Sequence, residues 1–194
     1  MTLAVGAEPE MRVLDYCAGA GGKTLGLAMT MQNRGHIVAC DVSEPRLDGA
    51  VRRLRRAGVH NVERHLIVAG DKWAKRRAAS FDRVLVDAPC TGTGTWRRNP
   101  DARLRLRALD LEELAVKQAM ILQEASKLLR PGGRLVYATC SVLPEENEAQ
   151  ISRFLEGNPA FSVVPTAAGA DFLSLTPRSH GTDGFFAAVL HLNM

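Results

Sequence analysis

Short apolar runs alternate along the chain with longer amphipathic stretches. The runs have the length and the Val, Ile and Leu content of β-strands, and they lie at residues 11–16, 36–40, 62–68, 81–86, 134–138, 161–164 and 185–192. The amphipathic stretches carry apolar residues at helical spacing and lie at residues 23–33, 43–57, 109–129 and 145–155. Ser43 is placed to cap the second helix and Gly58 to end it, and the Arg-Pro-Gly-Gly segment at 130–133 predicts a turn.

Strands that alternate with helices predict an α/β fold with a mostly parallel sheet and helices on both faces. The 194 residues and the hydrophobic fraction of 46% fit one globular domain, 1–194. In such sheets, ligands bind at the carboxyl ends of the strands. The chemically distinctive residues all follow predicted strands; they are residues 17–23, Asp41, Asp71, Asp87, Cys90 and Cys140. We therefore expect them to form a single site.

Basic side chains outnumber acidic ones by 25 to 21, which gives a net charge of +4. They gather at 52–56, 72–77 and 97–107, which favours a polyanionic partner, although solvated helix faces would show the same pattern. No apolar run reaches the ~18 residues of a membrane span. The first residues do not resemble a signal peptide, so we expect a reducing, cytoplasmic setting without membrane contact.

Four cysteines, Cys17, Cys40, Cys90 and Cys140, are the candidates for thiol chemistry. None of them forms a C-x-x-C pair and no histidine stands at zinc spacing, so we expect no metal site. Cys40 lies inside an apolar strand and is expected to be a buried core residue.

A glycine-rich turn between the first strand and the first helix indicates a cofactor site. Its glycines, Gly19, Gly21 and Gly22, do not match the G-x-G-x-x-G dinucleotide pattern, and a phosphate-binding loop would need glycine where Cys17 stands. Asp41 would bind ribose hydroxyls in an NAD enzyme or in an S-adenosylmethionine enzyme. Asp71 is placed to meet an adenine amino group. Acidic residues at three strand ends fit a sulfonium cofactor better than a pyrophosphate, although Asp41 and Asp71 could instead cap helices.

Six segments together resemble the bacterial ribosomal RNA small-subunit methyltransferase B (Fmu/Sun) family of RNA 5-methylcytosine methyltransferases. They are CAGAGGKT at 17–24, DVSEPRL at 41–47, GD at 70–71, DAPCTGTGTWRRNPDAR at 87–103, LRPGGRLVYATCSVLPEENE at 129–148 and DGFFAA at 183–188. They occur in family order and cover most of the chain.

The resemblance implies a Rossmann-like class I methyltransferase fold with a mostly parallel seven-stranded sheet and S-adenosyl-L-methionine as cofactor. It implies that Cys140 is the nucleophile and that Cys90 assists product release. It assigns cofactor binding to Cys17, Ala18, Gly19, Ala20, Gly21, Gly22, Lys23, Asp41, Arg46, Asp71 and Asp87. Arg97 and Arg98, after Cys90, are the predicted RNA contacts.

The chemistry of cytosine-5 methylation requires such residues. A thiolate that adds to carbon-6 turns carbon-5 into a nucleophile, and cysteine is already partly thiolate near neutral pH. The adduct must then lose a proton and the thiol, which a second thiol nearby can assist. Asp87 could also hydrogen-bond the base, which must be unstacked to reach the site.

Several alternatives remain open at this stage. The reactive cysteine would be Cys90 if the chain were a DNA-type cytosine methyltransferase, although the Thr139-Cys140-Ser141 segment argues against that. The chain could also be a catalytically weak core that binds RNA and cofactor, an NAD-dependent oxidoreductase, or an enzyme acting on tRNA instead of ribosomal RNA. Only about ten residues precede the first strand, whereas the family carries an N-terminal RNA-binding part. We therefore expect a monomeric catalytic core that binds cofactor well and RNA weakly.

Overall fold

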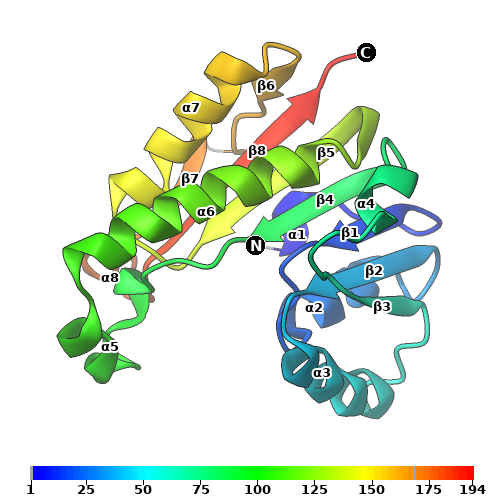
Figure 1. The fold of residues 1–194 in the computed structure, drawn as a ribbon, viewed down its shortest axis with the longest axis horizontal. Coiled ribbons are helices and arrows are strands. Elements are labelled where there is room, and N and C mark those ends of the chain that lie inside the picture. The colour runs from blue at the N-terminus through cyan, green and yellow to red at the C-terminus, as the bar shows by residue number, and fades with distance from the viewer. Residues whose placement is uncertain (1, 168) are drawn as a thin grey trace.

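The computed structural model describes residues 2–167 and 169–194 and shows one central sheet covered by helices on both faces (Figure 1). The strands follow the order β3-β2-β1-β4-β5-β8-β6, with β7 also paired to β8. The strands are β1 Arg12–Asp15, β2 His36–Asp41, β3 Val62–Leu66, β4 Phe81–Asp87, β5 Leu129–Thr139, β6 Phe161–Val163, β7 Phe172–Leu175 and β8 Phe185–Leu192. The helices are α1 Thr2–Val5, α2 Gly22–Thr30, α3 Glu44–Arg56, α4 Trp73–Arg76, α5 Pro100–Arg105, α6 Ala108–Ser126, α7 Glu148–Gly157 and α8 Pro177–His180, with 3-10 turns η1 Thr93–Thr95 and η2 Pro144–Glu146.

The first five strands are parallel, and β8 is antiparallel to β5, β6 and β7. The expected α/β class is therefore confirmed. The sheet has eight strands where seven were expected, because β6 and the unpredicted β7 pair with successive parts of β8. The short helices α4 and α5 were also not predicted, and each has at most six residues.

Apolar side chains that alternate along the strands form a core on each face of the sheet. On β1, Leu14 belongs to the same core cluster as Leu122 of α6 and Phe154 of α7, whereas Val13 belongs to the other cluster, with Leu27 of α2. Neighbouring strand residues face opposite sides, so one buried strand supplies both cores. Burial of one leucine side chain stabilises the folded state by roughly 1.5–3 kcal/mol. The two cores hold the strand ends in a fixed arrangement.

The predicted turn at 130–133 lies within β5 and not before it. Phe81 of β4 pairs with Leu129, but Arg83 pairs with Arg134, so the intervening residues of β5 form an irregular bulge. The preceding helix α6 accordingly ends at Ser126, because Leu129 already pairs in the sheet. The carboxyl end of β5 still lies beside that of β4, and Asp87 pairs with Ala138.

Candidate functional site

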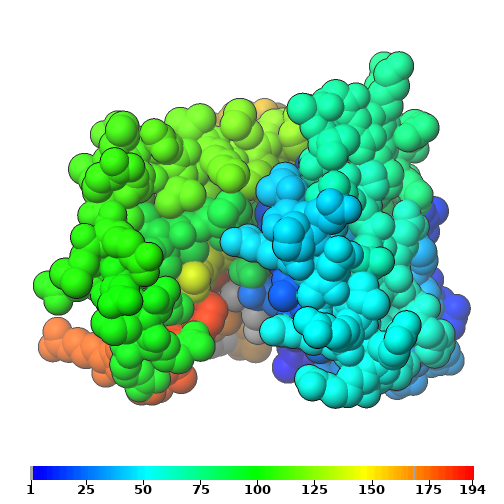
Figure 2. All heavy atoms as spheres, turned by 60° about the horizontal axis from the view of Figure 1, so that its bottom comes forward, coloured from blue at the N-terminus to red at the C-terminus, as the bar shows by residue number. Residues whose placement is uncertain are grey.

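A cavity of about 770 Å³ opens at the carboxyl ends of the parallel strands. Figure 2 shows the molecule hollowed between the green segments that carry α5 and α6 and the blue-to-cyan segment that carries α3. The side chains and loops that line the cavity are Tyr16, Cys17, Ala18, Gly19, Ala20, Gly22, Lys23, Asp41, Val42, Arg46, Ile67, Asp87, Ala88, Pro89, Cys90, Lys117, Met120, Ile121, Glu124 and Cys140.

The glycine-rich loop is tied to the end of β2 through Asp41. One carboxylate oxygen of Asp41 accepts the Gly19 N–H at 2.8 Å, and the other accepts the Ser43 N–H at 2.8 Å. The Asp41 side chain therefore caps the start of α3, and Ser43 makes no capping bond of its own. A carboxylate has about four lone-pair sites, so Asp41 keeps acceptor capacity toward the cavity. The sequence alternatives of helix cap and ligand contact are thus compatible at this residue.

Asp15 lies buried beneath the same loop, at the end of β1. Its Oδ2 accepts a hydrogen bond of 2.7 Å from the Thr24 hydroxyl, and its Oδ1 has no hydrogen-bond partner. Burial raises the pKa of Asp15 to about 7, with the nearby Asp87 and Asp41 adding to the rise, and the Thr24 bond and Lys23 opposing it. A carboxyl group that changes charge near neutral pH therefore underlies the site.

Lys23 and Asp87 form an ion pair inside the cavity. Lys23 comes from the first turn of α2 and Asp87 from the end of β4, and both side chains are partly exposed. Cys140 lines the same cavity, where the charge of Lys23 lowers the pKa of its thiol and that of Asp87 raises it. Donor and acceptor groups thus lie together at the same place in the cavity, beside a thiol.

Cys90 and Cys140 face each other with their sulfurs 3.4 Å apart. The hydrogen bond between the two thiols lowers the pKa of Cys140, despite the opposing effect of burial. The same hydrogen bond and burial raise the pKa of Cys90. The two sulfurs are close enough to share one proton, and the thiolate form is favoured at Cys140 over Cys90. Cys40 is buried, and burial raises the pKa of its thiol. Burial also raises the pKa of Cys17, to about 12.

The structure brings most of the predicted site residues to the cavity, but four of them lie elsewhere. Gly21 adopts φ 78 and packs against Ala50, so it shapes the loop without lining the cavity. Arg97 and Arg98 form ion pairs with the carboxylate of Asp183, which is buried.

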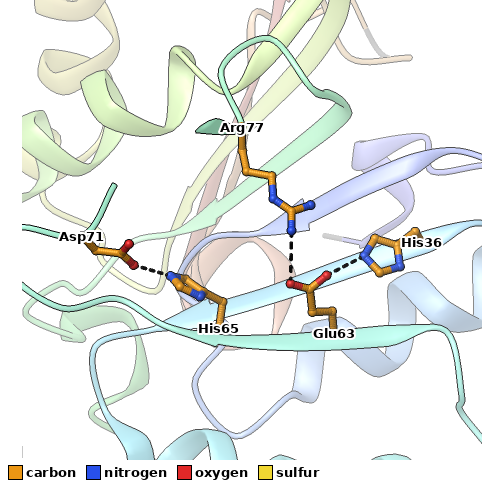
Figure 3. A network of polar contacts seen from close by, with 5 residues as sticks. All are labelled: His36, Glu63, His65, Asp71 and Arg77. Carbon is orange, nitrogen blue, oxygen red and sulfur yellow. Dashed lines mark hydrogen bonds and ion pairs between the residues drawn. The ribbon is translucent and has the colours of Figure 1, made fainter. Parts of the chain in front are cut away.

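Asp71 is the fourth residue outside the cavity lining. Its carboxylate accepts the Trp73 N–H at 2.7 Å and contacts His65 Nε2 at 2.7 Å (Figure 3). These two contacts lower the pKa of Asp71, the backbone bond contributing most. The sequence alternative, in which Asp71 caps a helix, describes the observed contact with the start of α4.

One wall of the cavity was missed by sequence reasoning. It consists of four residues of α6: Lys117, Met120, Ile121 and Glu124. They are spaced as i, i+3, i+4 and i+7, which places them on one face of the helix. This spacing was visible in the sequence, but it is equally typical of a helix face that packs on a core.

The exposed side of α3 carries four arginines: Arg52, Arg53, Arg55 and Arg56. Within residues 2–167 and 169–194, no carboxylate lies within ion-pair distance of these four. The same helix contributes Arg46 to the cavity at its other end. Positive charge therefore lies both at the cavity end of α3, with Arg46, and at its far end, with the four arginines.

Residues 2–191 match the family described as 16S rRNA methyltransferase RsmB/F. The chain belongs to the RsmB/F family. It is 39% identical over 193 residues to ribosomal RNA small subunit methyltransferase B of Pasteurella multocida, which covers 92% of this chain and 42% of that protein. The corresponding protein of Salmonella arizonae is 41% identical over 187 residues, in an alignment that covers 92% of this chain and 41% of that protein. The chain thus spans about two fifths of the length of these RsmB/F relatives.

Solved structures agree with this assignment. NSun6 from Pyrococcus horikoshii, solved with SFG, superimposes with a TM-score of 0.87 at 28% identity, covering 100% of this chain and 50% of that one. A methyltransferase homologue from the same organism gives a TM-score of 0.83 at 32% identity, covering 100% and 65%. SFG is an analogue of S-adenosylmethionine, the cofactor of the RsmB/F family. The expected methyltransferase fold and cofactor class are therefore confirmed.

The residues around the cavity fit S-adenosylmethionine. A Cβ at Gly19 or Gly22 would meet no protein atom within 4 Å, and both glycines line the cavity, so there is open space beside this loop. Asp41 brings a carboxylate to the cavity, which suits ribose hydroxyls and a cationic cofactor, and Val42, Ile67 and Ile121 bring apolar surface, which suits an adenine ring. No helix in the part of the chain that the structure describes is long and apolar enough to cross a membrane.

Proposed function

We propose that this chain, residues 1–194, is the catalytic core of an S-adenosylmethionine-dependent RNA methyltransferase that forms 5-methylcytosine, with ribosomal RNA as substrate. The observation that carries the proposal is the pair of thiols, 3.4 Å apart, in the same cavity as the glycine-rich loop. The family match and the names of the relatives support ribosomal RNA as the substrate class. Neither thiol would be needed by a protein that only binds RNA and cofactor.

In this proposal the glycine-rich loop, residues 17–23, holds the cofactor together with Asp41, Arg46 and Asp87. Asp41 binds the ribose hydroxyls with the acceptor capacity that Gly19 and Ser43 leave free. When bound, the cofactor supplies an electrophilic methyl carbon attached to a sulfonium sulfur. Asp71 could contribute only after leaving its contacts with His65 and Trp73, so we place it outside the binding set in the conformation described.

Cys140 begins the reaction as the thiolate. Its sulfur forms a bond to carbon-6 of the target cytosine, and the electrons of the C5–C6 double bond make carbon-5 nucleophilic. Asp87 and Lys23 lie beside this thiol and can orient the base through its hydrogen-bonding edge. After methyl transfer to carbon-5, Cys90 loses its own proton to solvent and, as a thiolate, takes the proton from carbon-5. The C5–C6 double bond then re-forms as the sulfur of Cys140 departs with its electron pair.

Cys90 is the group placed to assist release. Its sulfur lies 3.4 Å from that of Cys140 and lines the same cavity, so Cys90 is placed to take the proton from carbon-5 beside the departing sulfur. Outside the cavity, Arg97 and Arg98 are partly neutralised by Asp183, whereas the arginines of α3 have no such partner among the described residues. We therefore assign RNA phosphate contacts to Arg97, Arg98 and the arginine face of α3.

A denaturing gel tests the proposal. Unmethylated, cytosine-containing ribosomal RNA and S-adenosylmethionine are mixed at high concentration with Cys90→Ser, Cys140→Ser and the matched control Cys40→Ser, whose thiol is buried. We expect a protein–RNA adduct to accumulate in Cys90→Ser only, because this variant forms the bond but resolves it slowly. Adducts in Cys140→Ser alone would reverse the roles of the cysteines. If neither catalytic variant gave an adduct, the covalent mechanism would be wrong.

A further inference from the structure

The loop that carries Cys90 is held by a buried glutamate outside the cavity lining. Glu146, in the 3-10 turn η2, is 0% exposed. It accepts the Thr91 N–H at 2.9 Å and the Thr91 hydroxyl at 2.5 Å. Both bonds act on the residue directly after Cys90, so the position of Glu146 fixes the backbone at that thiol.

Gln118 of α6 holds the other side of the same loop. Its amide group donates to the carbonyl of Pro89 at 2.9 Å and to Glu146 at 2.9 Å. Gln118 is also 0% exposed. Cys90 is therefore bracketed by two buried side chains that are hydrogen-bonded to each other, an arrangement that leaves the loop little freedom.

The loop that carries Cys140 is held by Asn147, the residue that follows Glu146 in the chain. Its carbonyl oxygen accepts the Thr139 hydroxyl at 2.6 Å, and its amide donates to the Ser141 carbonyl at 3.1 Å. These are the two neighbours of Cys140. Asn147 is buried as well, at 4% exposed.

The backbone at this point of the chain is itself tied to the core. The Tyr137 hydroxyl, within β5, donates to the Glu146 carbonyl at 2.7 Å. The two loops also meet directly, since the hydroxyls of Thr93 and Ser141 lie 2.9 Å apart. Consecutive residues of one anchored turn thus hold two loops that are 50 residues apart in the sequence.

We propose that Glu146 and Asn147 form a clamp that sets the position of the two thiols relative to each other, with Glu146 positioning Cys90 and Asn147 positioning Cys140. The inference rests on the proposed function for its catalytic consequences. Because each residue holds one loop, the two are expected to affect different steps. Loss of Asn147 slows formation of the RNA adduct, and loss of Glu146 slows its resolution. Displacing a reacting group by about 1 Å costs on the order of 10²-fold in rate.

The test uses Glu146→Ala and Asn147→Ala in the whole chain, with Gln150→Leu as the matched control. Gln150 is buried in α7 and donates to the carbonyls of Ala115 and Glu145. Its loss therefore also breaks buried hydrogen bonds, one of them to the turn that carries Glu146, but leaves the direct bonds from Glu146 and Asn147 to the thiol loops in place. If Glu146→Ala does not fold, Thr91→Val replaces it, because it removes only the hydroxyl that donates to Glu146.

Two RNA substrates separate the steps. With 5-fluorocytidine RNA the methylated adduct has no proton to lose from carbon-5, so the trapped product reports formation alone. With ordinary RNA, the level of adduct at steady state reports resolution. We expect Asn147→Ala to slow trapping by about 10²-fold, and Glu146→Ala to trap normally but to accumulate adduct with ordinary RNA. Equal losses in both steps, matching those of Gln150→Leu, would refute the clamp.

A readout without RNA or cofactor separates the clamp from the proposed function. Diamide oxidises two neighbouring thiols to a disulfide while its azo group is reduced to a hydrazine. Peptide mapping then gives the rate at which Cys90 and Cys140 become linked. We expect both clamp variants to form this link more slowly than Gln150→Leu, because their sulfurs are no longer held in contact. Rates equal to the control would refute the clamp even if methylation were confirmed, and slower rates would support it even if methylation failed.

Discussion

Asp15→Asn should remove a pH dependence of stability that the buried carboxyl group imposes. The folded state raises the pKa of Asp15 from 3.8 to about 7, chiefly by burial. A raised pKa in the folded state means that Asp15 contributes stability below pH 3.8 and that this contribution is lost as pH rises toward 7. The full window of about 3 pH units corresponds to about 4 kcal/mol, of which about 2 kcal/mol falls between pH 5 and pH 7.

The assay is urea unfolding of both proteins at a series of pH values, followed by circular dichroism. The free energy of unfolding of the wild type should fall relative to that of Asp15→Asn by about 2 kcal/mol from pH 5 to pH 7. Subtracting the two proteins cancels the titrations they share. Asp48→Asn is the control, because it removes an exposed carboxylate paired only with Arg64 at the surface. A difference between wild type and Asp15→Asn that stays constant over this range would refute the reasoning.

Three further predictions concern the site. Gly94→Ala should lower the free energy of unfolding by about 1–3 kcal/mol in urea titration, because a Cβ there would overlap the backbone of Gly184. Asp41→Asn should weaken S-adenosylmethionine binding in calorimetry by at least about tenfold, since an amide nitrogen cannot accept one of the two backbone N–H groups. Arg52→Glu with Arg56→Glu should weaken RNA binding and make the slope of log K against log salt shallower by about 0.7 for each phosphate that the protein no longer neutralises. An unchanged slope would show that these two arginines of α3 do not contact RNA phosphates.

The location of the site could be predicted from the sequence because its strands are clear. Residues 37–40 and 84–86 are continuous apolar runs, and Asp41 and Asp87 follow them directly. The carboxyl ends of parallel strands share one edge, so strand positions alone brought these residues together. The catalytic roles of Cys90 and Cys140 could be predicted only with the family resemblance, since a lone cysteine after a strand is more often a core residue.

The hydrogen bonds between side chains were not predictable in the same way. From the sequence, Glu146 is expected to be an acidic residue in the first turn of a helix, a position that is usually solvated. In the structure a 3-10 turn precedes α7 and directs Glu146 inward to Thr91. Asp71 likewise follows a strand, but a short loop returns it to His65 of β3. The strand β7 escaped prediction because it has only four residues and one of them is exposed.

The place of β8 in the sheet bears on how the protein is made on the ribosome. β8 follows β6 and β7 in the chain, yet it lies between them and β5. Until Leu192 has left the ribosomal exit tunnel, one edge of β5 has no partner, and Gly94 beside the Cys90 loop lacks its backbone bond with Gly184. The thiol site is therefore completed only after β8 has emerged, and the nascent chain exposes a long unpaired strand edge until then.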